Sequence, residues 1–205
     1  MSITYPAQLP TASGIATIEL RASNAVVVSK SPFTGVQQAL AYPRQEWSAT
    51  VTLPPLKRAN AESWIAFLIA QRGGYGTFLM GDPLGATPRG VATGTPVVAS
   101  GSTGGSVNIS GASVSVTGWL KAGDYVQLGS GSTATLHKVL VDVDTAADGT
   151  ATLEVWPFQR RTLTVGETVT LNDTVGNFRL SAGDTAWSAS EGVKYGISFD
   201  CMEAI

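Results

Sequence analysis

The strongest constraint on the fold of this chain is a two-residue alternation of apolar and polar side chains. Between Glu46 and Leu53 the apolar positions are Trp47, Ala49, Val51 and Leu53, each followed or preceded by a polar residue. Such alternation is typical of a strand with one buried face. The same period occurs in residues 15–20 and near the end of the chain, where Tyr195, Ile197, Phe199 and Cys201 share a face. Further strands are predicted at 25–30, 36–41, 77–80, 125–128, 134–141, 150–156, 168–171 and 178–180. The sequence therefore predicts a mainly β protein.

One segment, residues 57–72, departs from this period. Ala61, Trp64, Ile65 and Leu68 fall on a single helical stripe. Pro54-Pro55 end the preceding strand, and Gly73-Gly74 offer the positive φ that commonly closes a helix. We expect this to be the only substantial helix.

The composition changes after Gly81 and suggests a discontinuous domain. Residues 82–90 are turn formers, and residues 91–118 carry no charge. The uncharged stretch is either a flexible linker or a set of weak short strands at 97–98, 107–109 and 114–116, and we favour the strands. A second boundary is predicted at 172–176. The expected fold is a β-sandwich or barrel with one α-helix, built from 1–88 and 173–205, and interrupted by a small inserted β-barrel at 89–172.

Charge and composition disfavour several classes of function. The formal net charge is −2 and only 14% of residues are charged, without the basic patch that nucleic-acid binding needs. No apolar run approaches the roughly 20 residues that span a bilayer, and the N-terminus lacks a secretion signal. The single cysteine, Cys201, rules out an internal disulfide and suggests a reducing compartment.

Two segments resemble ligand loops, but neither meets the requirements of one. In Gly118–Gly129 the glycines lead into a strand, whereas a phosphate-binding loop leads into a helix; a turn between strands is the simpler interpretation, and a ligand loop the alternative. Asp142, Asp144 and Asp148 suggest a calcium loop, but Ala146, Ala147 and Leu153 occupy the positions of its third ligand, glycine and glutamate. A hairpin is predicted instead, and neither a metal nor a cofactor is expected.

The inventory of reactive groups is small. His137 is the only histidine, and no G-x-S-x-G turn accompanies it. Cys201 lies on the apolar face of a strand, where a thiol behaves as a small hydrophobe. No catalytic residue is assigned, and the chain is not expected to be an enzyme.

Aromatic and arginine side chains cluster at one place, Trp156-Pro-Phe158 followed by Gln159-Arg160-Arg161. Trp156, Phe158, Arg160 and Arg161 are therefore the candidate contact residues for a partner protein or a sugar. The interpretation that we favour is a hairpin corner with solvated arginines, and a binding site is the alternative.

The order of these segments resembles that of a known family. An alternating strand (46–53), a Pro-Pro break and a helix (60–72) are followed by Gly-Gly, a strand and Gly81-Asp-Pro83. The insertion then carries Leu120-Lys-Ala-Gly-Asp-Tyr-Val-Gln-Leu128, and the chain ends with Asn177–Leu180 and Tyr195–Ala204. The layout is similar to the distal tail proteins of long-tailed, non-contractile bacteriophages, in the compact two-domain kind with an inserted oligonucleotide/oligosaccharide-binding-like (OB-like) barrel.

The resemblance implies a structural virion protein, made in the cytoplasm of the host bacterium and located at the distal end of the tail. It implies a ring, usually of six copies, that joins the tail-tube protein to the baseplate hub or tail tip. The inserted barrel would project outward, where receptor-binding or side-fibre proteins attach. DNA would pass through the lumen without specific binding, so a neutral or acidic lumen is expected. The alternative is a carbohydrate- or receptor-binding module that acts through residues 89–172, and a tail-associated hydrolase that uses His137 is a third hypothesis.

Overall fold

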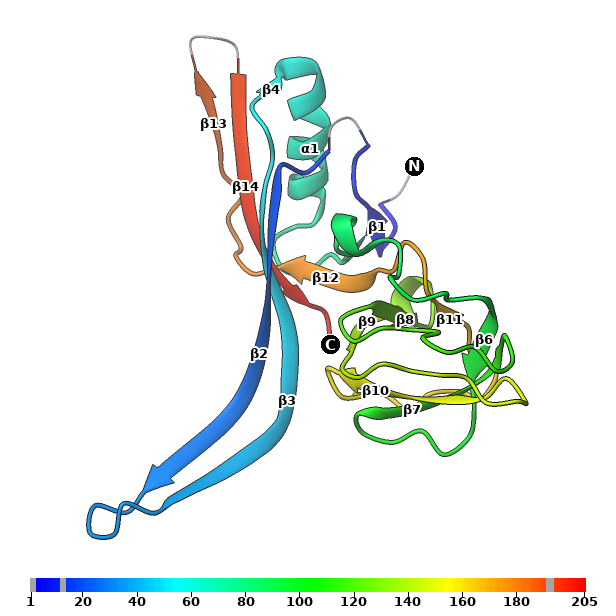
Figure 1. Ribbon diagram of the computed structural model, residues 1–205. Helices are drawn as coiled ribbons and strands as arrows, with labels where there is room; N and C mark the ends of the chain where they lie inside the picture. Colours follow the sequence, from blue (N-terminus) through cyan, green and yellow to red (C-terminus); the bar gives the residue numbers. More distant parts are fainter. Residues whose placement is uncertain (1–2, 12–13, 191–193) are drawn as a thin grey trace.

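The protein is mainly β, as predicted, with 45% strand and 10% helix. The computed structural model describes residues 3–11, 14–190 and 194–205. In that part of the chain the strands form two sheets, a mixed sheet of eight strands and a nearly closed barrel of six. A long hairpin extends from the mixed sheet past the barrel (Figure 1).

The mixed sheet draws its strands from both ends of the chain. They are β1 (Ala7–Gln8), β2 (Thr17–Lys30), β3 (Gln37–Thr52), β4 (Leu56–Lys57), β5 (Phe78–Met80), β12 (Gly176–Leu180), β13 (Trp187–Ser190) and β14 (Lys194–Glu203). The C-terminal strand β14 is the centre of the sheet, because it pairs with β3, β4, β12 and β13. The two ends of the sequence are thereby built into one sheet. The β1–β5 pair is parallel, and the other pairs are antiparallel.

The predicted apolar faces form the core of this sheet. Trp47, Ala49 and Val51 are buried on one face of β3. Helix α1 (Arg58–Ala70) covers the sheet with Ala61, Trp64, Ile65, Phe67 and Leu68, which are buried. The predicted helix end needs one correction: α1 stops at Ala70, and Arg72 (φ 53°) enters the left-handed region ahead of Gly73 (φ 67°). The helix therefore ends before the glycine pair.

The barrel comes from the middle of the chain. Its strands are β6 (Gly94–Val98), β7 (Ser106–Ala112), β8 (Tyr125–Leu128), β9 (Thr135–Val139), β10 (Ala151–Trp156) and β11 (Val169–Thr170), and the 3-10 turns are η1 (Pro83–Gly85) and η2 (Gly131–Thr133). A bridge between Val97 and Thr168 nearly closes it. The uncharged stretch forms strands β6 and β7, but residues 114–116 do not form the predicted third one, since Ser115 has a φ of 52° in a turn. Trp119, Leu120 and Leu153 belong to a core cluster of the barrel's own.

Side-chain contacts join the barrel to the mixed sheet. Trp47 Nε1 of β3 donates to Leu136 O of β9 at 2.9 Å, and Asn177 Nδ2 of β12 donates to Gly131 O at 2.9 Å. The barrel residues Tyr125 and Leu136 pack in the same core cluster as Trp47. The two sheets therefore share part of one hydrophobic core.

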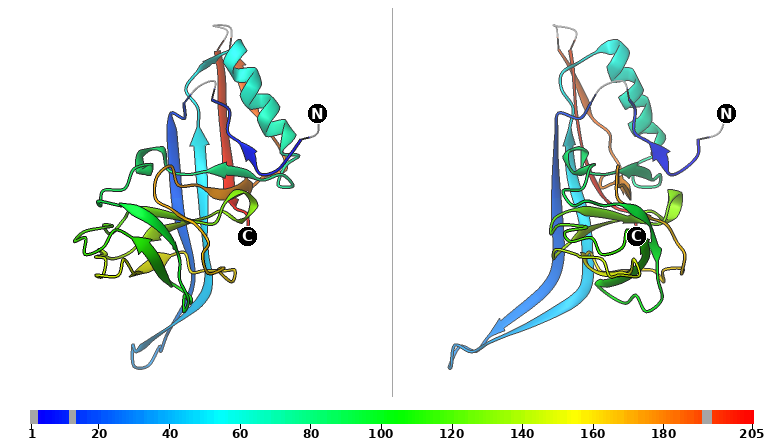
Figure 2. Two further views of the ribbon diagram at one scale, coloured as in Figure 1. Left: turned by 90° about the vertical axis from the view of Figure 1, so that its right-hand side faces the viewer. Right: turned by 45° about the vertical axis from the view of Figure 1, so that its right-hand side comes forward.

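The hairpin β2–β3 is the most extended element of the structure (Figures 1 and 2). The sequence predicted shorter separate strands here; they are instead merged into strands of 14 and 16 residues. The pairing shifts register between the pairs Asn24↔Gln45 and Val26↔Ala41. Ala25 thus faces three residues of β3, among them Pro43, and such a bulge bends a ribbon. We call residues 26–41, which lie beyond this bulge, the arm.

Candidate functional site

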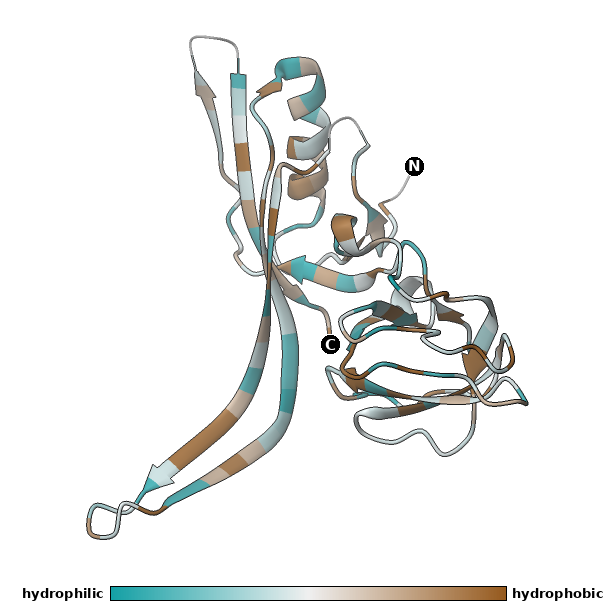
Figure 3. Ribbon diagram, viewed as in Figure 1, coloured by the Kyte–Doolittle hydropathy of each residue, from teal (hydrophilic) through white to brown (hydrophobic). Residues whose placement is uncertain are grey.

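The arm carries apolar side chains that nothing in the described chain covers. Val27 is 56% exposed, Leu40 is 55% exposed and Phe33 at the tip is 95% exposed. Val26, Val28 and Val36 are also exposed, and Figure 3 shows the hydrophobic stretch along this half of β2. Because neighbouring strand residues point to opposite faces, the three consecutive valines make both faces of the ribbon apolar.

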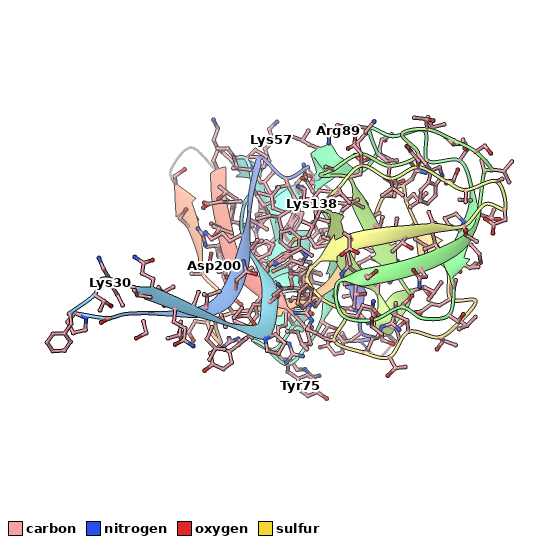
Figure 4. All side chains as sticks on the ribbon, turned by 60° about the horizontal axis from the view of Figure 1, so that its bottom comes forward. Lys30, Lys57, Tyr75, Arg89, Lys138 and Asp200 are labelled. Carbon is pink, nitrogen blue, oxygen red and sulfur yellow. The ribbon has the colours of Figure 1, made fainter. Side chains whose placement is uncertain are left out.

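The edges of the arm are equally unprotected. In the part of the chain that the structure describes, β2 pairs with β3 alone, so its outer edge offers unpaired backbone groups. Monomeric proteins usually protect such edges with charges, yet Lys30 is the only charged residue between 26 and 41. Figure 4 shows Lys30 far from the other labelled side chains. Since a two-stranded ribbon is marginally stable in water, the arm has the properties of a surface that binds another chain.

The predicted contact residue Trp156 lies at the base of this arm. Its Nε1 donates to Asn24 Oδ1 at 2.8 Å. Its ring stands edge-on to Trp47, with the ring centroids 4.5 Å apart. Two residues further on, Phe158 N donates to Gln45 Oε1 at 2.7 Å. The segment that leaves the barrel strand β10 thus contacts both strands of the hairpin.

Arg160 extends the same set of contacts into the mixed sheet. Its guanidinium donates to Gln45 O and forms an ion pair with Glu203. Glu203 is buried and accepts a further hydrogen bond from Trp47 N at 3.1 Å. Burial raises the pKa of Glu203, and the Arg160 guanidinium offsets part of that rise. Arg160 is therefore held between the segment that leaves β10 and the mixed sheet. We call this set of contacts the junction.

Arg161 points elsewhere, into a turn of the barrel. Its two terminal nitrogens bind the two carboxylate oxygens of Glu167 at 2.9 and 2.5 Å. Burial opposes the ionisation of Glu167, but the hydrogen bonds from Arg161 and from Thr164 N hold its pKa below the usual range. Of the four predicted contact residues, the structure brings Trp156, Phe158 and Arg160 together and places Arg161 apart. That they bind a partner stays a prediction.

Sequence reasoning missed the other half of this junction, which consists of Asn24, Gln45 and Glu203. These polar residues come from strands that are far from Trp156 in the sequence. Pro43, which lies between the predicted strands 36–41 and 46–53, is the one available signal, because proline in a strand marks an edge or a bulge.

The Gly118–Gly129 segment forms a turn whose polar groups are used internally. The carboxylate of Asp124 accepts hydrogen bonds from the backbone N–H groups of Arg89, Gly90 and Lys121 at 2.9, 3.0 and 2.8 Å. Burial alone would raise the pKa of Asp124, but these bonds lower it. The turn thereby fastens the connection that enters the barrel.

The aspartates considered for a calcium loop also bind within the chain. Asp142 accepts from Lys121 Nζ and Ala122 N, and Asp144 accepts from Gly118 N. Within residues 3–11, 14–190 and 194–205, no group of three or more His, Cys, Asp or Glu side chains is placed to hold a metal ion.

His137 and Cys201 are buried in satisfied environments. His137 Nδ1 lies 2.7 Å from Pro157 O, and Nε2 lies 3.0 Å from Thr135 Oγ1. Because a carbonyl only accepts, Nδ1 carries the proton of the neutral ring. Burial lowers the pKa of His137 to about 4, and burial raises the pKa of Cys201 to about 12.

Comparisons with models of known protein families and with curated proteins find no match to this sequence. Among the described residues, no helix has the length and apolar character needed to cross a bilayer.

Proposed function

We propose that this protein is the subunit of a ring at the distal end of a bacteriophage tail, where it joins the tail tube to the baseplate hub or tail tip. The role is structural and involves no catalysis. The order of motifs along the chain carries the tail assignment, through the resemblance to distal tail proteins with an OB-like insertion. The exposed arm is the structural observation that supports assembly.

Two features of the arm support a contact with another copy of the same chain. Its exposed apolar residues, among them Val27, Leu40 and Phe33, would be buried in a subunit interface, which is favourable. Its outer edge lies at one end of the strand order, with β1 and β13 at the opposite margin of the sheet. A contact between two different surfaces of one subunit is head-to-tail, and head-to-tail contacts form a ring when the rotation between neighbouring subunits closes and a filament when it does not.

The test is the mass and shape of the purified protein. Light scattering is expected to give a mass near six times the 21.2 kDa subunit, and negative-stain electron microscopy is expected to show rings with a central hole. Gold-labelled antibodies on virions from a lysate that expresses the gene are expected to mark the far end of the tail. A protein that stays monomeric over the whole accessible concentration range, with no label on virions, would contradict the proposal.

A second candidate, sugar binding by the barrel, rests on a shallow groove of about 460 Å³ on its surface. Ser100, Asn108, Thr150 and Thr152 line this groove together with Asp144, and hydroxyl and amide groups are suited to hydrogen bonding with sugars. Glycan-array binding by the full-length protein that is lost in Thr152→Val would favour this candidate. No binding by either protein would exclude it for the glycans on the array.

A further inference from the structure

The segment Trp156–Arg160 contacts the hairpin at one particular place. On the hairpin, its hydrogen-bond partners are Asn24 of β2 and Gln45 of β3. These two residues are directly paired with each other, and theirs is the last pair before the register shift. The barrel therefore holds the hairpin at the position where the regular ladder of the sheet ends and the arm begins.

The bulge makes this position the natural pivot of the arm. Between Asn24↔Gln45 and Val26↔Ala41, the ladder is interrupted and Pro43 has no N–H to donate. Beyond it, the arm residues are largely exposed, so the contacts that fix the direction of the arm lie at its base.

The contacts at the base come from three chemically different groups. The Trp156 indole N–H binds the Asn24 side chain, and the Phe158 backbone N–H binds the Gln45 side chain. The Arg160 guanidinium binds the Gln45 carbonyl and is itself held by the buried Glu203. Trp156 packs on Trp47, which belongs to the shared core. The segment is thus anchored to the mixed sheet while it holds the hairpin.

We propose that Trp156–Arg160 is a clamp that sets the direction of the arm, and that it thereby links the position of the barrel to the position of the arm. A partner that fixes the arm would also fix the barrel, and a partner that turns the barrel would redirect the arm, because coupling between two sites is reciprocal. In the proposed ring, each barrel would in this way be oriented by the neighbour that receives the arm. The clamp itself does not depend on the proposed function, since it is a property of one chain.

The test measures the arm in single molecules. Donor and acceptor dyes are attached to the full-length protein through Thr34→Cys at the arm tip and Ala66→Cys on the exposed face of α1. Cys201 stays in place, because it is buried and its pKa is raised to about 12. Single-molecule FRET at picomolar concentration follows one chain at a time, so the result is independent of whether rings form.

The clamp variant is Trp156→Phe combined with Gln45→Ala, which removes both side-chain hydrogen bonds but keeps an aromatic ring on Trp47. We expect its FRET distribution to broaden about twofold relative to the unmodified clamp, since two of the three contacts that fix the direction of the arm are removed and only the one from Arg160 to Gln45 O remains. The matched control is Gln38→Ala on the arm, which pairs with Ser29 and is not one of the two hairpin residues, Asn24 and Gln45, that bind Trp156–Arg160, and it is expected to leave the distribution unchanged.

The proposal is overturned if the clamp variant keeps the original distribution, or if Gln38→Ala broadens it equally. Should the double variant fail to fold, Trp156→Phe alone decides, because it removes the indole N–H donor and keeps an aromatic ring, though a smaller one, at that position; an unchanged width then counts against the clamp. The light-scattering mass of the unmodified protein separately tests the ring, so failure of the clamp and failure of the proposed function are distinguishable.

Discussion

At the scale of single residues, burial determines what the few titratable groups can do. His137 and Cys201, which sequence reasoning considered as candidates for chemistry, are 2% and 1% exposed. Their pKa values are displaced in the directions that favour the neutral forms, to about 4 and about 12. Both residues act as packing groups that also satisfy a neighbouring carbonyl.

The depressed pKa of His137 predicts a loss of stability in acid. The unfolded chain takes up the proton near pH 6.5, while the folded chain resists it until about pH 4. Stability is therefore full above pH 6.5 and falls as the pH drops through this window, by about 3 kcal/mol at pH 4. Urea unfolding at pH 7 and pH 4 measures the loss.

The control for this prediction is His137→Gln, whose amide can still donate to Pro157 O but does not titrate. The carboxylates titrate equally in both proteins. The difference between the two proteins in the pH dependence of the free energy of unfolding therefore isolates His137. Identical slopes for the two proteins would show that the ring is not held neutral.

At the scale of elements, the arm shows how a strand can be predicted while its role is not. The segments 25–30 and 36–41 have strand-like composition, and both are strands. Their apolar and polar residues do not alternate, since Val26, Val27 and Val28 follow one another. This pattern fits a ribbon in which neither face packs on the core. A single sequence cannot distinguish that pattern from a strand buried on both faces.

Charging the arm is expected to prevent assembly without unfolding the subunit. Val27 and Leu40 are directly paired across the ribbon and both are exposed. Val27→Lys with Leu40→Glu keeps an attractive cross-strand pair but makes burial of the arm in an interface costly. Light scattering is expected to show the monomer mass, with an unchanged circular dichroism spectrum.

Ile69→Lys serves as the matched control, because Ile69 is also 55% exposed but lies on α1. That variant is expected to assemble normally. Equal assembly of the arm variant and the unmodified protein would place the subunit interface elsewhere.

At the scale of the whole molecule, the sequence predicted the parts better than their contacts. Local period identified the buried face of β3, the single helix and most of the barrel strands, because each depends on neighbours within one segment. The junction depends on Trp156 meeting Asn24, and Arg160 meeting Glu203. Those meetings follow from the topology of two sheets, and topology leaves no local signal in one sequence.

The two segments that connect the mixed sheet to the barrel are closely packed at Gly81, so a side chain at this position is expected to destabilise the fold. A Cβ at Gly81 would lie 1.9 Å from Thr174 O, where the segment entering the barrel lies beside the segment leaving it. Gly81→Ala is expected to lower the free energy of unfolding by about 2–4 kcal/mol, because the backbone has to move where the two segments lie side by side. Thermal unfolding is the measurement.

Gly14→Ala is the comparison, since a Cβ at Gly14 has no atom within 4 Å. Gly14→Ala is expected to change the midpoint temperature of thermal unfolding little. If Gly81→Ala unfolds at the same temperature as Gly14→Ala, the backbone around Gly81 and Thr174 is packed more loosely than the 1.9 Å distance indicates.

The neighbouring strands β5 and β12, through which the chain enters and leaves the barrel, determine how the protein responds to mechanical load. A force that pulls the barrel away from the mixed sheet acts lengthwise along both strands at once. The bonds that hold β12 to β14 run across that direction, so they are loaded together in shear and cannot be opened one after another. Such shear loading is the mechanically stronger of the two geometries that a β ladder offers, so the barrel is expected to stay attached to the mixed sheet under a pulling force.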